Sequence, residues 1–489
     1  MKLFRIRGGV HPPERKDATK DKAVVAVPVS GKLYLPLQQH IGAPARPVVK
    51  AGDYVLKGQV IAEAAGPVSA PIHASTSGTV EAVGLYPVPH PSGLKGMAIA
   101  LVPDGLDAWA EPMPPLSLDA APEEIAKRVG QAGIVGLGGA TFPSAVKLNL
   151  RERYSLDTLV MNAAECEPFL TCDDRLMREF TEELLLGVAL MGRALGVTRT
   201  LVAVEANKPE ATAAMTAAAQ AYPEISVVTV PTRYPMGSEK HLVHTLTGRE
   251  TPARALTADI GVVVHNIATA YAVHDAVILG RPLVSRILTV SGGAVAQPMN
   301  LKVALGTPIA DLIAFCGGLT EEPQELLSGG PMMGQPLRST EIPTVKGMNG
   351  VLALIPADTR RGPAHACLRC GTCVSACPCG LLPFEIAAHI RNGNFEAAVD
   401  AGLMDCIGCG SCAFACPSRI PLVQTFHHAK GHLAAQQRAQ SRNEEAKRLV
   451  QQKAARQEKL AAERKAAAEA KKAAAAKARA AAEAAKGTE

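Results

Sequence analysis

Two cysteine-rich segments, CLRCGTCVSACP at residues 367–378 and CIGCGSCAFACP at residues 406–417, decide the character of this chain. Each follows the pattern C-x2-C-x2-C-x3-C-P, which is typical of domains that hold two [4Fe-4S] clusters. The first three thiolates of a segment surround one face of a cluster, and the fourth, which precedes the proline, reaches the other cluster. The predicted ligand sets are Cys367, Cys370, Cys373 and Cys416 for one cluster, and Cys377, Cys406, Cys409 and Cys412 for the other.

Zinc is the alternative occupant of such cysteines. Zinc sites usually combine two CxxC knuckles for each ion, and that arrangement explains a doubled run of four cysteines poorly. The insert between the two segments predicts two short helices around residues 392–394, so we expect a helical ferredoxin-like domain over residues 360–425. Cys379 breaks the ligand spacing and is predicted to be a loop thiol, and Cys172 and Cys316 are predicted to be buried thiols.

Charge and cysteines are both unevenly distributed over the 489 residues. Residues 430–489 hold 15 Lys and Arg against 7 Asp and Glu, which leaves 36 against 38 in the rest of the chain. This Ala/Lys-rich tail has no apolar stripe, so it predicts a solvated helix or a disordered extension. It also has no aromatic residue, which argues against nucleic-acid binding. Ten of the twelve cysteines lie beyond residue 310, which favours ligand clusters in a reducing compartment over a disulfide framework.

Membrane insertion and secretion are not predicted. The apolar stretches at residues 184–197 and 260–279 are interrupted by charged and polar residues, so neither predicts a spanning helix. The N-terminus, MKLFRIRGG, lacks the apolar core and the cleavage site of a signal peptide. We therefore expect a cytoplasmic protein with, at most, peripheral membrane attachment.

The region before the cysteines divides into three parts. Residues 1–115 are rich in Pro, Gly and Val and predict a small β domain. Residues 116–285 alternate apolar strand-like runs with helical segments, as in an α/β domain. Residues 286–345 predict a further small domain with Gly-rich turns. The first part contains segments that resemble biotinyl and lipoyl carrier domains, but Pro67 stands where the modified lysine is expected, so an unmodified docking barrel is predicted.

A glycine-rich loop, GLGGATFPSAVK at residues 136–147, lies in the α/β region ahead of a helical segment. It is neither a dinucleotide-binding fingerprint nor a Walker A loop. Closely spaced glycines let backbone N–H groups approach a phosphate, and a lysine in the following helix can neutralise that phosphate. By itself the loop is weak evidence, because glycine turns are common.

Combined with other motifs, the loop is specific evidence for a family resemblance. Together with MNAAECEP (161–168), YPMGSE (234–239) and HNIAT (265–269), it resembles the FMN- and NADH-binding motifs of the flavoprotein subunit of respiratory complex I. With GGVHPPERK (8–16), the barrel and the cysteine segments added, the chain up to residue 425 resembles the C subunit of the Rnf/Rsx electron-transport complex. The resemblance implies an α/β multidomain fold: an N-terminal barrel sandwich, a Rossmann-like FMN/NADH domain, a β-grasp-like (SLBB) domain and a ferredoxin-like domain with two [4Fe-4S] clusters.

The resemblance also implies a cofactor pocket. Gly136, Gly138, Gly139 and Lys147 would hold the FMN phosphate and ribityl chain, and Phe142 would stack on the nicotinamide or adenine. The pocket would be completed by Asn162, Glu165, Cys166, Glu167, Tyr234, Gly237, Glu239 and Asn266. Leu137, Ala164 and Cys166 depart from the complex I pattern, which weakens the case for the nucleotide contacts more than that for FMN. Without the flanking motifs, Glu165 and Glu167 would be read as a solvated or helix-capping pair.

The implied function is electron input to a membrane complex. The resemblance indicates a peripheral subunit on the cytoplasmic side of the bacterial inner membrane, which passes electrons between NADH, FMN and two [4Fe-4S] clusters. Other members of the complex would be its partners, and ferredoxin its remote redox partner. Two alternatives stay open: a soluble cobalamin reductase of similar architecture, and a flavin-free electron-transfer or scaffold subunit.

Overall fold

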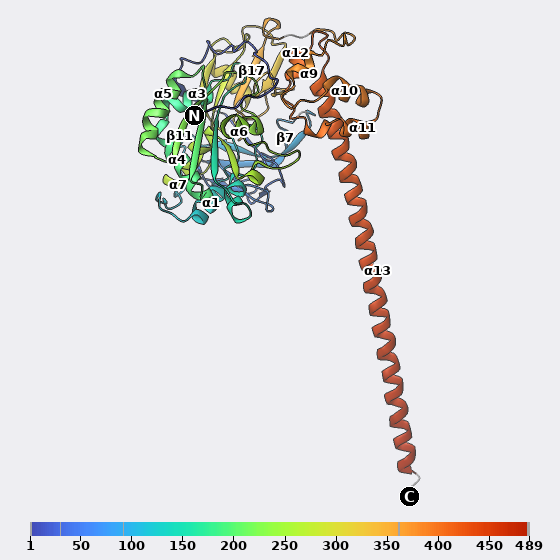
Figure 1. Cartoon of the computed structure of the whole chain (residues 1–489). Helices are drawn as coiled ribbons and strands as arrows, with labels where there is room; N and C mark the ends of the chain where they lie inside the picture. Colours follow the sequence, from blue (N-terminus) through green and yellow to red (C-terminus); the bar gives the residue numbers. More distant parts are fainter. Residues whose placement is uncertain (1, 30, 91, 360–361, 487–489) are drawn as a thin grey trace.

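The computed structural model describes residues 2–29, 31–90, 92–359 and 362–486. Figure 1 shows a folded body, made of β-rich and α/β parts with a small helical part at one edge, from which one long helix projects. The α/β multidomain fold predicted from the sequence is confirmed.

The N-terminal β domain consists of two small sheets. One contains β2 (Leu33–Pro36), β8 (Lys95–Pro103), β7 (Gly78–Pro87) and β4 (Tyr54–Val55), and the other β3 (Arg46–Pro47), β5 (Val60–Glu63) and β6 (Ile72–His73). Apolar side chains from both sheets, including Leu35, Ile61 and Ile99, are fully or almost fully buried between them. This is the sandwich arrangement expected for the barrel.

The α/β domain is built on a four-stranded parallel sheet. Its order is β11 (Ile225–Val230), β10 (Arg199–Glu205), β9 (Thr158–Ala163), β12 (Val262–Asn266). Alternate residues point to opposite faces: Leu159 and Met161 pack with the helices α1 (Pro122–Gln131), α4 (Thr181–Leu195) and α7 (Ile267–Ile278), whereas Val160 packs with α6 (Glu239–Thr247). The chain reverses direction across the sheet between β9 and β12, and the carboxyl ends of strands at such a point form the usual ligand crevice.

A six-stranded mixed sheet forms the third part. Its order is β1 (Val24–Ala26), β14 (Met299–Ala304), β13 (Ser285–Ser291), β17 (Gly350–Leu354), β15 (Glu325–Ser328), β16 (Gln335–Pro336), and α8 (Ile309–Phe315) packs on it. The run at residues 23–29, expected in the N-terminal β domain, instead supplies β1 to this sheet, where Val24 pairs with Asn300. Strand propensity predicted that this run is extended, but it could not predict which sheet edge the run would join.

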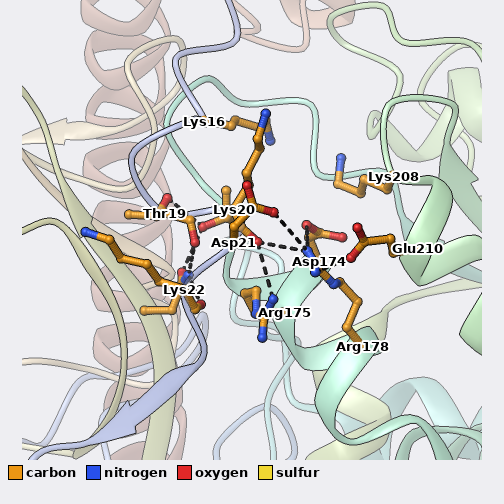
Figure 2. Close-up of polar contacts among 12 residues, drawn as sticks. Lys16, Thr19, Lys20, Asp21, Lys22, Asp174, Arg175, Arg178, Lys208 and Glu210 are labelled. Atoms are coloured by element: carbon orange, nitrogen blue, oxygen red, sulfur yellow. Dashed lines mark hydrogen bonds and ion pairs between the residues drawn. The ribbon is translucent and has the colours of Figure 1, made fainter.

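The residues before β1 cross the α/β domain and are fastened to it by charged groups (Figure 2). The Lys16 amine donates hydrogen bonds to the carbonyl oxygens of Glu165 and Leu170, at 2.7 and 2.6 Å. Arg175 and Arg178, on α3 (Cys172–Glu179), donate to the Lys20 carbonyl oxygen. The N-terminal segment therefore connects the α/β domain to the six-stranded sheet.

The cysteine region is helical, as predicted. The two cysteine segments contain α9 (Thr372–Ala376) and α12 (Ser411–Ala415), and the insert between them forms α10 (Pro383–Arg391) and α11 (Phe395–Asp400). Ile386, Leu403 and Phe426 make a small buried core with the start of the last helix.

The tail continues α13 (Leu422–Lys486), which is 65 residues long. At 1.5 Å per residue this helix measures about 100 Å. Only its first turns pack on the cysteine region, and from residue 434 to residue 482 every side chain is exposed. Of the two states expected for the tail, the structure shows the helix. None of the helices in the described ranges combines the length and the apolar character that a membrane crossing requires.

Lys346 joins three parts of the body. Its side chain is fully buried, and its amine donates hydrogen bonds to the Pro71 carbonyl oxygen of the β domain (2.8 Å) and the Gly133 carbonyl oxygen of the α/β domain (2.7 Å). Burial lowers the pKa of this amine to about 7. A pKa shift of one unit corresponds to about 1.4 kcal/mol. Burial of this amine therefore lowers the free energy of unfolding by several kcal/mol at neutral pH.

Replacement of Lys346 tests the free-energy cost of burying its amine. Between about pH 7 and pH 10.5 the unfolded chain binds more protons at Lys346 than the folded chain, so this group makes the unfolding free energy rise with pH. In Lys346→Met this contribution is absent. We expect the melting temperature of the wild type, minus that of Lys346→Met, to increase from pH 7 to pH 10. Lys95→Met, at an exposed position, is the control and should give a constant difference. A constant difference for Lys346→Met as well would contradict the assignment.

Candidate functional site

Three loops meet at the carboxyl edge of the parallel sheet, where β9, β11 and β12 end. The side chain of Asn162, at the end of β9, donates to the Gly237 carbonyl oxygen (2.8 Å). This hydrogen bond joins the loop after β9 to the loop after β11. Asn266, at the end of β12, caps α7 by accepting from the Ala268 N–H (2.9 Å) and donates to Asp173 (2.8 Å). Both asparagines, predicted as pocket residues, are thus held at the crevice between β9 and β12.

The glycine loop lies against the start of α7. Leu137 is buried, its N–H donates to Thr269 and its carbonyl oxygen accepts from Arg286, so the loop is fixed at this residue. A Cβ atom on Gly138 would lie 3.0 Å from the Asn266 side chain, whereas Gly139 has φ +102° and a Cβ there would meet open space. The tip of the loop therefore exposes backbone next to a helix N-terminus, an arrangement that suits a phosphate.

Lys147 and Glu239 form the polar wall of the crevice. The Lys147 amine donates to the Val264 carbonyl oxygen (3.0 Å) and lies 3.6 Å from a Glu239 carboxylate oxygen. Thr257 donates to the other Glu239 oxygen (2.7 Å). Phe142 is half-buried at the glycine loop, and its carbonyl oxygen accepts from the Gly136 N–H.

Glu165 and Glu167 have different surroundings. One oxygen of the buried Glu165 accepts from the Asp173 N–H (2.8 Å) at the start of α3, so this residue caps a helix, the interpretation that the sequence left open. Its other oxygen makes no hydrogen bond and lies 3.8 Å from the Lys16 amine. Both Glu167 oxygens accept backbone N–H groups, from Met332 and Met333 at 2.9 Å, and burial raises the pKa of Glu167 to about 7. Glu167 thus fastens the α/β domain to a loop of the six-stranded sheet.

Cys166 is half-buried beside Gly237. Its sulfur accepts from the Gly237 N–H (3.4 Å), and a Cβ on Gly237 would lie only 2.8 Å from the Ala164 carbonyl oxygen. Burial raises the pKa of Cys166 to about 12, so the thiol stays protonated at neutral pH and does not supply a nucleophile.

Tyr234 connects this crevice to the cysteine region. Its side chain is buried, and its hydroxyl donates to the Cys409 carbonyl oxygen (2.6 Å). Nearby, the His241 ring contacts the Pro378 carbonyl oxygen at 3.0 Å, and the Gly9 N–H donates to the Ala376 carbonyl oxygen at 2.9 Å. Loops from both cysteine segments are therefore pressed directly against the α/β domain.

The cysteines surround two cavities. The first, which we call the outer cavity, has a volume of about 190 Å³ and is lined by the predicted set Cys367, Cys370, Cys373 and Cys416. The second, the inner cavity, is smaller and is lined by the predicted set Cys377, Cys406, Cys409 and Cys412, together with Cys379. Cys367 and Cys370 are exposed, whereas Cys409 and Cys412 are buried. Each cavity thus draws cysteines from both segments, in the crossed pattern that the spacing predicts.

Family models match consecutive parts of this chain. They are the RnfC barrel sandwich hybrid domain at residues 4–105, the Nuo51 FMN-binding domain at 129–275, the SLBB domain at 287–336 and the 4Fe-4S dicluster domain at 366–420. Their order is that of the parts seen in the structure.

Characterised relatives are similar over most of the chain. The C subunit of the ion-translocating oxidoreductase complex of Rhodobacter capsulatus is 58% identical over 439 residues, which are 89% of this chain and 85% of the relative. The C subunit of the corresponding complex of Pseudomonas aeruginosa is 44% identical over 93% of this chain and 59% of the relative. The C subunit of the proton-translocating ferredoxin:NAD(+) oxidoreductase complex of Clostridium ljungdahlii is 44% identical over 91% of this chain and 96% of the relative.

This chain belongs to the family of C subunits of ion-translocating oxidoreductase complexes. As a C subunit with an FMN-binding domain and a 4Fe-4S dicluster domain, it is an electron-transfer component of such a complex, and the other members of the complex are its partners.

The residues present in this C subunit fit both kinds of cofactor. A side chain at Gly139 would fill open space at the tip of the glycine loop, so the glycine keeps room for a ligand. The described residues that line the two cysteine cavities include no His, Asp or Glu, so cysteine thiols are the main metal ligands that each cavity offers. Four thiolates for each metal centre match a [4Fe-4S] cluster.

Some site residues escaped sequence reasoning. Asp173 holds Asn266, and Lys16 holds the carbonyl oxygens of Glu165 and Leu170. The only sequence signal for Lys16 was its position in the GGVHPPERK motif. Nothing in the sequence around Asp173 marks it as a site residue. Asp173, Glu165 and Cys172 also place ligand atoms within 4.8 Å of one another, close enough to share a metal ion.

The grouping of the cysteines around two cavities leads to a prediction about the iron content. We expect Cys370→Ser and Cys412→Ser each to remove about four of about eight irons per chain, because each loses a ligand of a different cubane. Iron and acid-labile sulfide of anaerobically purified protein measure this loss. Cys316→Ser, at a buried thiol outside both cavities, is the matched control and should keep the full iron content. Zinc in place of iron in the wild type would contradict the assignment.

Proposed function

We propose that this C subunit passes electrons between NADH and the rest of its complex, through one FMN and two [4Fe-4S] clusters, with ferredoxin as the remote donor or acceptor. The chain would be a peripheral subunit on the cytoplasmic side of the bacterial inner membrane. The Clostridium relative, whose name includes ferredoxin and NAD(+), supports this choice of redox partners.

The observation that carries the proposal is the continuous contact from the flavin crevice to the surface. Tyr234 comes from the loop after β11, close to the predicted flavin residues, and its hydroxyl is bonded to the loop that contains Cys409. Cys409 lines the inner cavity, and α12, which carries Cys412 of the inner cavity, packs against α9, which carries Cys373 of the outer cavity. The outer cavity carries exposed cysteines. This arrangement favours an electron path from the crevice to the inner cavity, then to the outer cavity, and from there to a partner protein of the complex.

The chain's own residues account for binding at the crevice. The glycine loop and the N-terminus of α7 would hold the phosphate of FMN, with Lys147 as a nearby positive charge. Asn162 and Gly237, joined by their hydrogen bond, would form the wall beside the ring system. FMN, when bound, can take up two electrons together and release them singly, which is the step that links NADH to one-electron carriers.

At the cysteine cavities the protein contributes ligands and surroundings. Eight thiolates would hold the two clusters, and the apolar residues Ile386 and Phe426 at the inner cavity limit its contact with water. The outer cavity is bordered by exposed Leu368 and Phe384 and by Arg369 and Arg391. An apolar rim with basic residues suits contact with another electron-transfer protein.

The proposal is tested by a spectrum of anaerobically purified protein before and after addition of NADH. We expect near-stoichiometric flavin absorbance that NADH bleaches, followed by loss of the broad iron–sulfur absorbance. Gly139→Val should reduce the flavin content severalfold or more, because a side chain fills the cradle. Gly52→Val is the matched control: Gly52 also has a positive φ and open space, but it lies in the β domain.

The alternatives give different results. A flavin-free wild-type protein would favour the scaffold or electron-transfer role without FMN. Flavin that NADH does not reduce would contradict NADH as the substrate. Rapid reduction of a corrin, without membrane proteins in the purified material, would favour the cobalamin reductase.

A further inference from the structure

A cavity of about 550 Å³ lies where the three parts of the body meet, and we call it the junction cavity. The β domain, the α/β domain and the six-stranded sheet all contribute polar or aromatic side chains to it: Lys57, Ser75, Asp107, Trp109, Tyr271, Asp275, Arg281, Arg286 and Lys302. Small-molecule sites are often found between domains, and volumes of roughly 300–1,000 Å³ are typical of them.

The junction cavity is separate from the predicted flavin crevice. Among the described residues that line it, Leu137 is the one member of the glycine loop, and none is a predicted cofactor residue. The two sites share a wall, because Arg286 lines the junction cavity and donates to the Leu137 carbonyl oxygen at 2.8 Å. A ligand in the junction cavity would therefore be additional to FMN and NADH.

The lining of the junction cavity carries excess positive charge. Its described charged residues are two acidic ones, Asp107 and Asp275, and four basic ones, Lys57, Arg281, Arg286 and Lys302. Asp107 pairs with Lys57 at 2.6 Å, and Asp275 contacts His274 at 3.1 Å. Within the described ranges, the other three basic residues have no carboxylate at ion-pair distance. A ligand with two negative charges would balance this lining.

Aromatic rings hold several of these basic groups. The Lys57 amine and the Arg281 guanidinium group lie 5.0 and 5.2 Å from the centre of the Trp109 ring. The Lys302 amine lies 5.5 Å from the centre of the Tyr271 ring and donates to its hydroxyl at 3.2 Å. A ring attracts a cation without neutralising it, so the positive charge stays available to a ligand.

Two buried polar atoms of the lining residues have no hydrogen-bond partner in the described structure. They are the Ser75 hydroxyl and the Arg286 Nε, on residues that are 0% and 3% exposed. A buried donor without a partner destabilises a fold, and such groups are rare in proteins. Phosphate oxygens accept hydrogen bonds from both kinds of donor.

We propose that the junction cavity binds a phosphate monoester with a planar ring, a small molecule of the size of a nucleoside monophosphate. A phosphate monoester carries a charge of about −1.5 to −2 at pH 7, which matches the excess of the lining. Its oxygens would accept from Arg286, Lys302 and the Ser75 hydroxyl. Its ring would lie on the apolar and aromatic part of the lining, which includes Trp109 and Tyr271.

The experiment is a titration of the anaerobically purified whole chain with AMP as the probe. Trp109 is the one tryptophan of the chain and lines the cavity, so its fluorescence reports binding there, and calorimetry gives the dissociation constant. We expect a saturable change with AMP, and binding at least about tenfold weaker for adenosine and for inorganic phosphate, each of which lacks one half of the ligand. The absence of saturable AMP binding would overturn the proposal, and equal affinity for inorganic phosphate would overturn the planar-ring ligand.

Substitutions in the lining test the residues. Lys302→Met should weaken AMP binding about tenfold or more, because it removes a charged partner. Ser75→Ala should also weaken it, yet leave the melting temperature of the ligand-free chain unchanged or higher, because its hydroxyl has no partner to lose. Lys95→Met, at an exposed position of the β domain, is the control and should bind AMP like the wild type. Unchanged affinity in both Lys302→Met and Ser75→Ala would contradict the site.

AMP is one half of NADH, so binding in the flavin crevice must be distinguished from binding in the junction cavity. Lys147→Met changes the crevice and should leave the affinity for AMP unchanged. Weaker AMP binding in Lys147→Met, with wild-type affinity in Lys302→Met, would overturn the junction cavity as the site. A chain that binds AMP but holds no flavin would defeat the proposed function and still support this inference.

Discussion

The hydrogen bond from the Tyr234 hydroxyl to the Cys409 carbonyl oxygen is the contact on which the redox arrangement depends. It is buried and spans 175 positions of sequence, so it fixes a loop of the α/β domain against a loop of the inner cavity. Glu167 acts in parallel, because it holds the Met332–Met333 backbone, and the Met332 carbonyl oxygen faces Gly410. Two contacts thus set the distance between the crevice of the α/β domain and the inner cysteines.

A cluster of buried charges supports the same edge of the sheet. Lys16, Lys208, Glu165 and Glu205 are all buried: Lys208 pairs with Glu205, Lys16 lies 3.8 Å from Glu165, and both lysines donate to the Glu165 carbonyl oxygen. Burial, together with repulsion from Lys208, lowers the pKa of Lys16. Buried charges tolerate the loss of a partner poorly, so they favour a single arrangement of the N-terminal segment over the crevice.

The sequence predicted best what depends on local spacing. The cysteine sets follow from the positions of eight residues, and the structure groups them in the same way. Partners far away in the chain were not predictable: the direction of the Tyr234 hydroxyl and the backbone N–H groups that bind Glu167 depend on how domains pack. The burial of Lys346 was equally hidden, since lysine is almost never fully buried and its acceptors come from two other domains. The same limit applied to β1, whose extended conformation was visible in the sequence but whose neighbouring strand was not.

The position of β1 has a consequence for synthesis on the ribosome. Val24 pairs with Asn300, so the strand waits for a partner that is made 276 residues later. At roughly 5–20 residues per second, this delay is about 15–55 s. During that time β1 has an unpaired edge, although the β domain that follows it can already fold. Strand β1 is therefore fixed in its sheet only after the β domain that follows it in the sequence has been made.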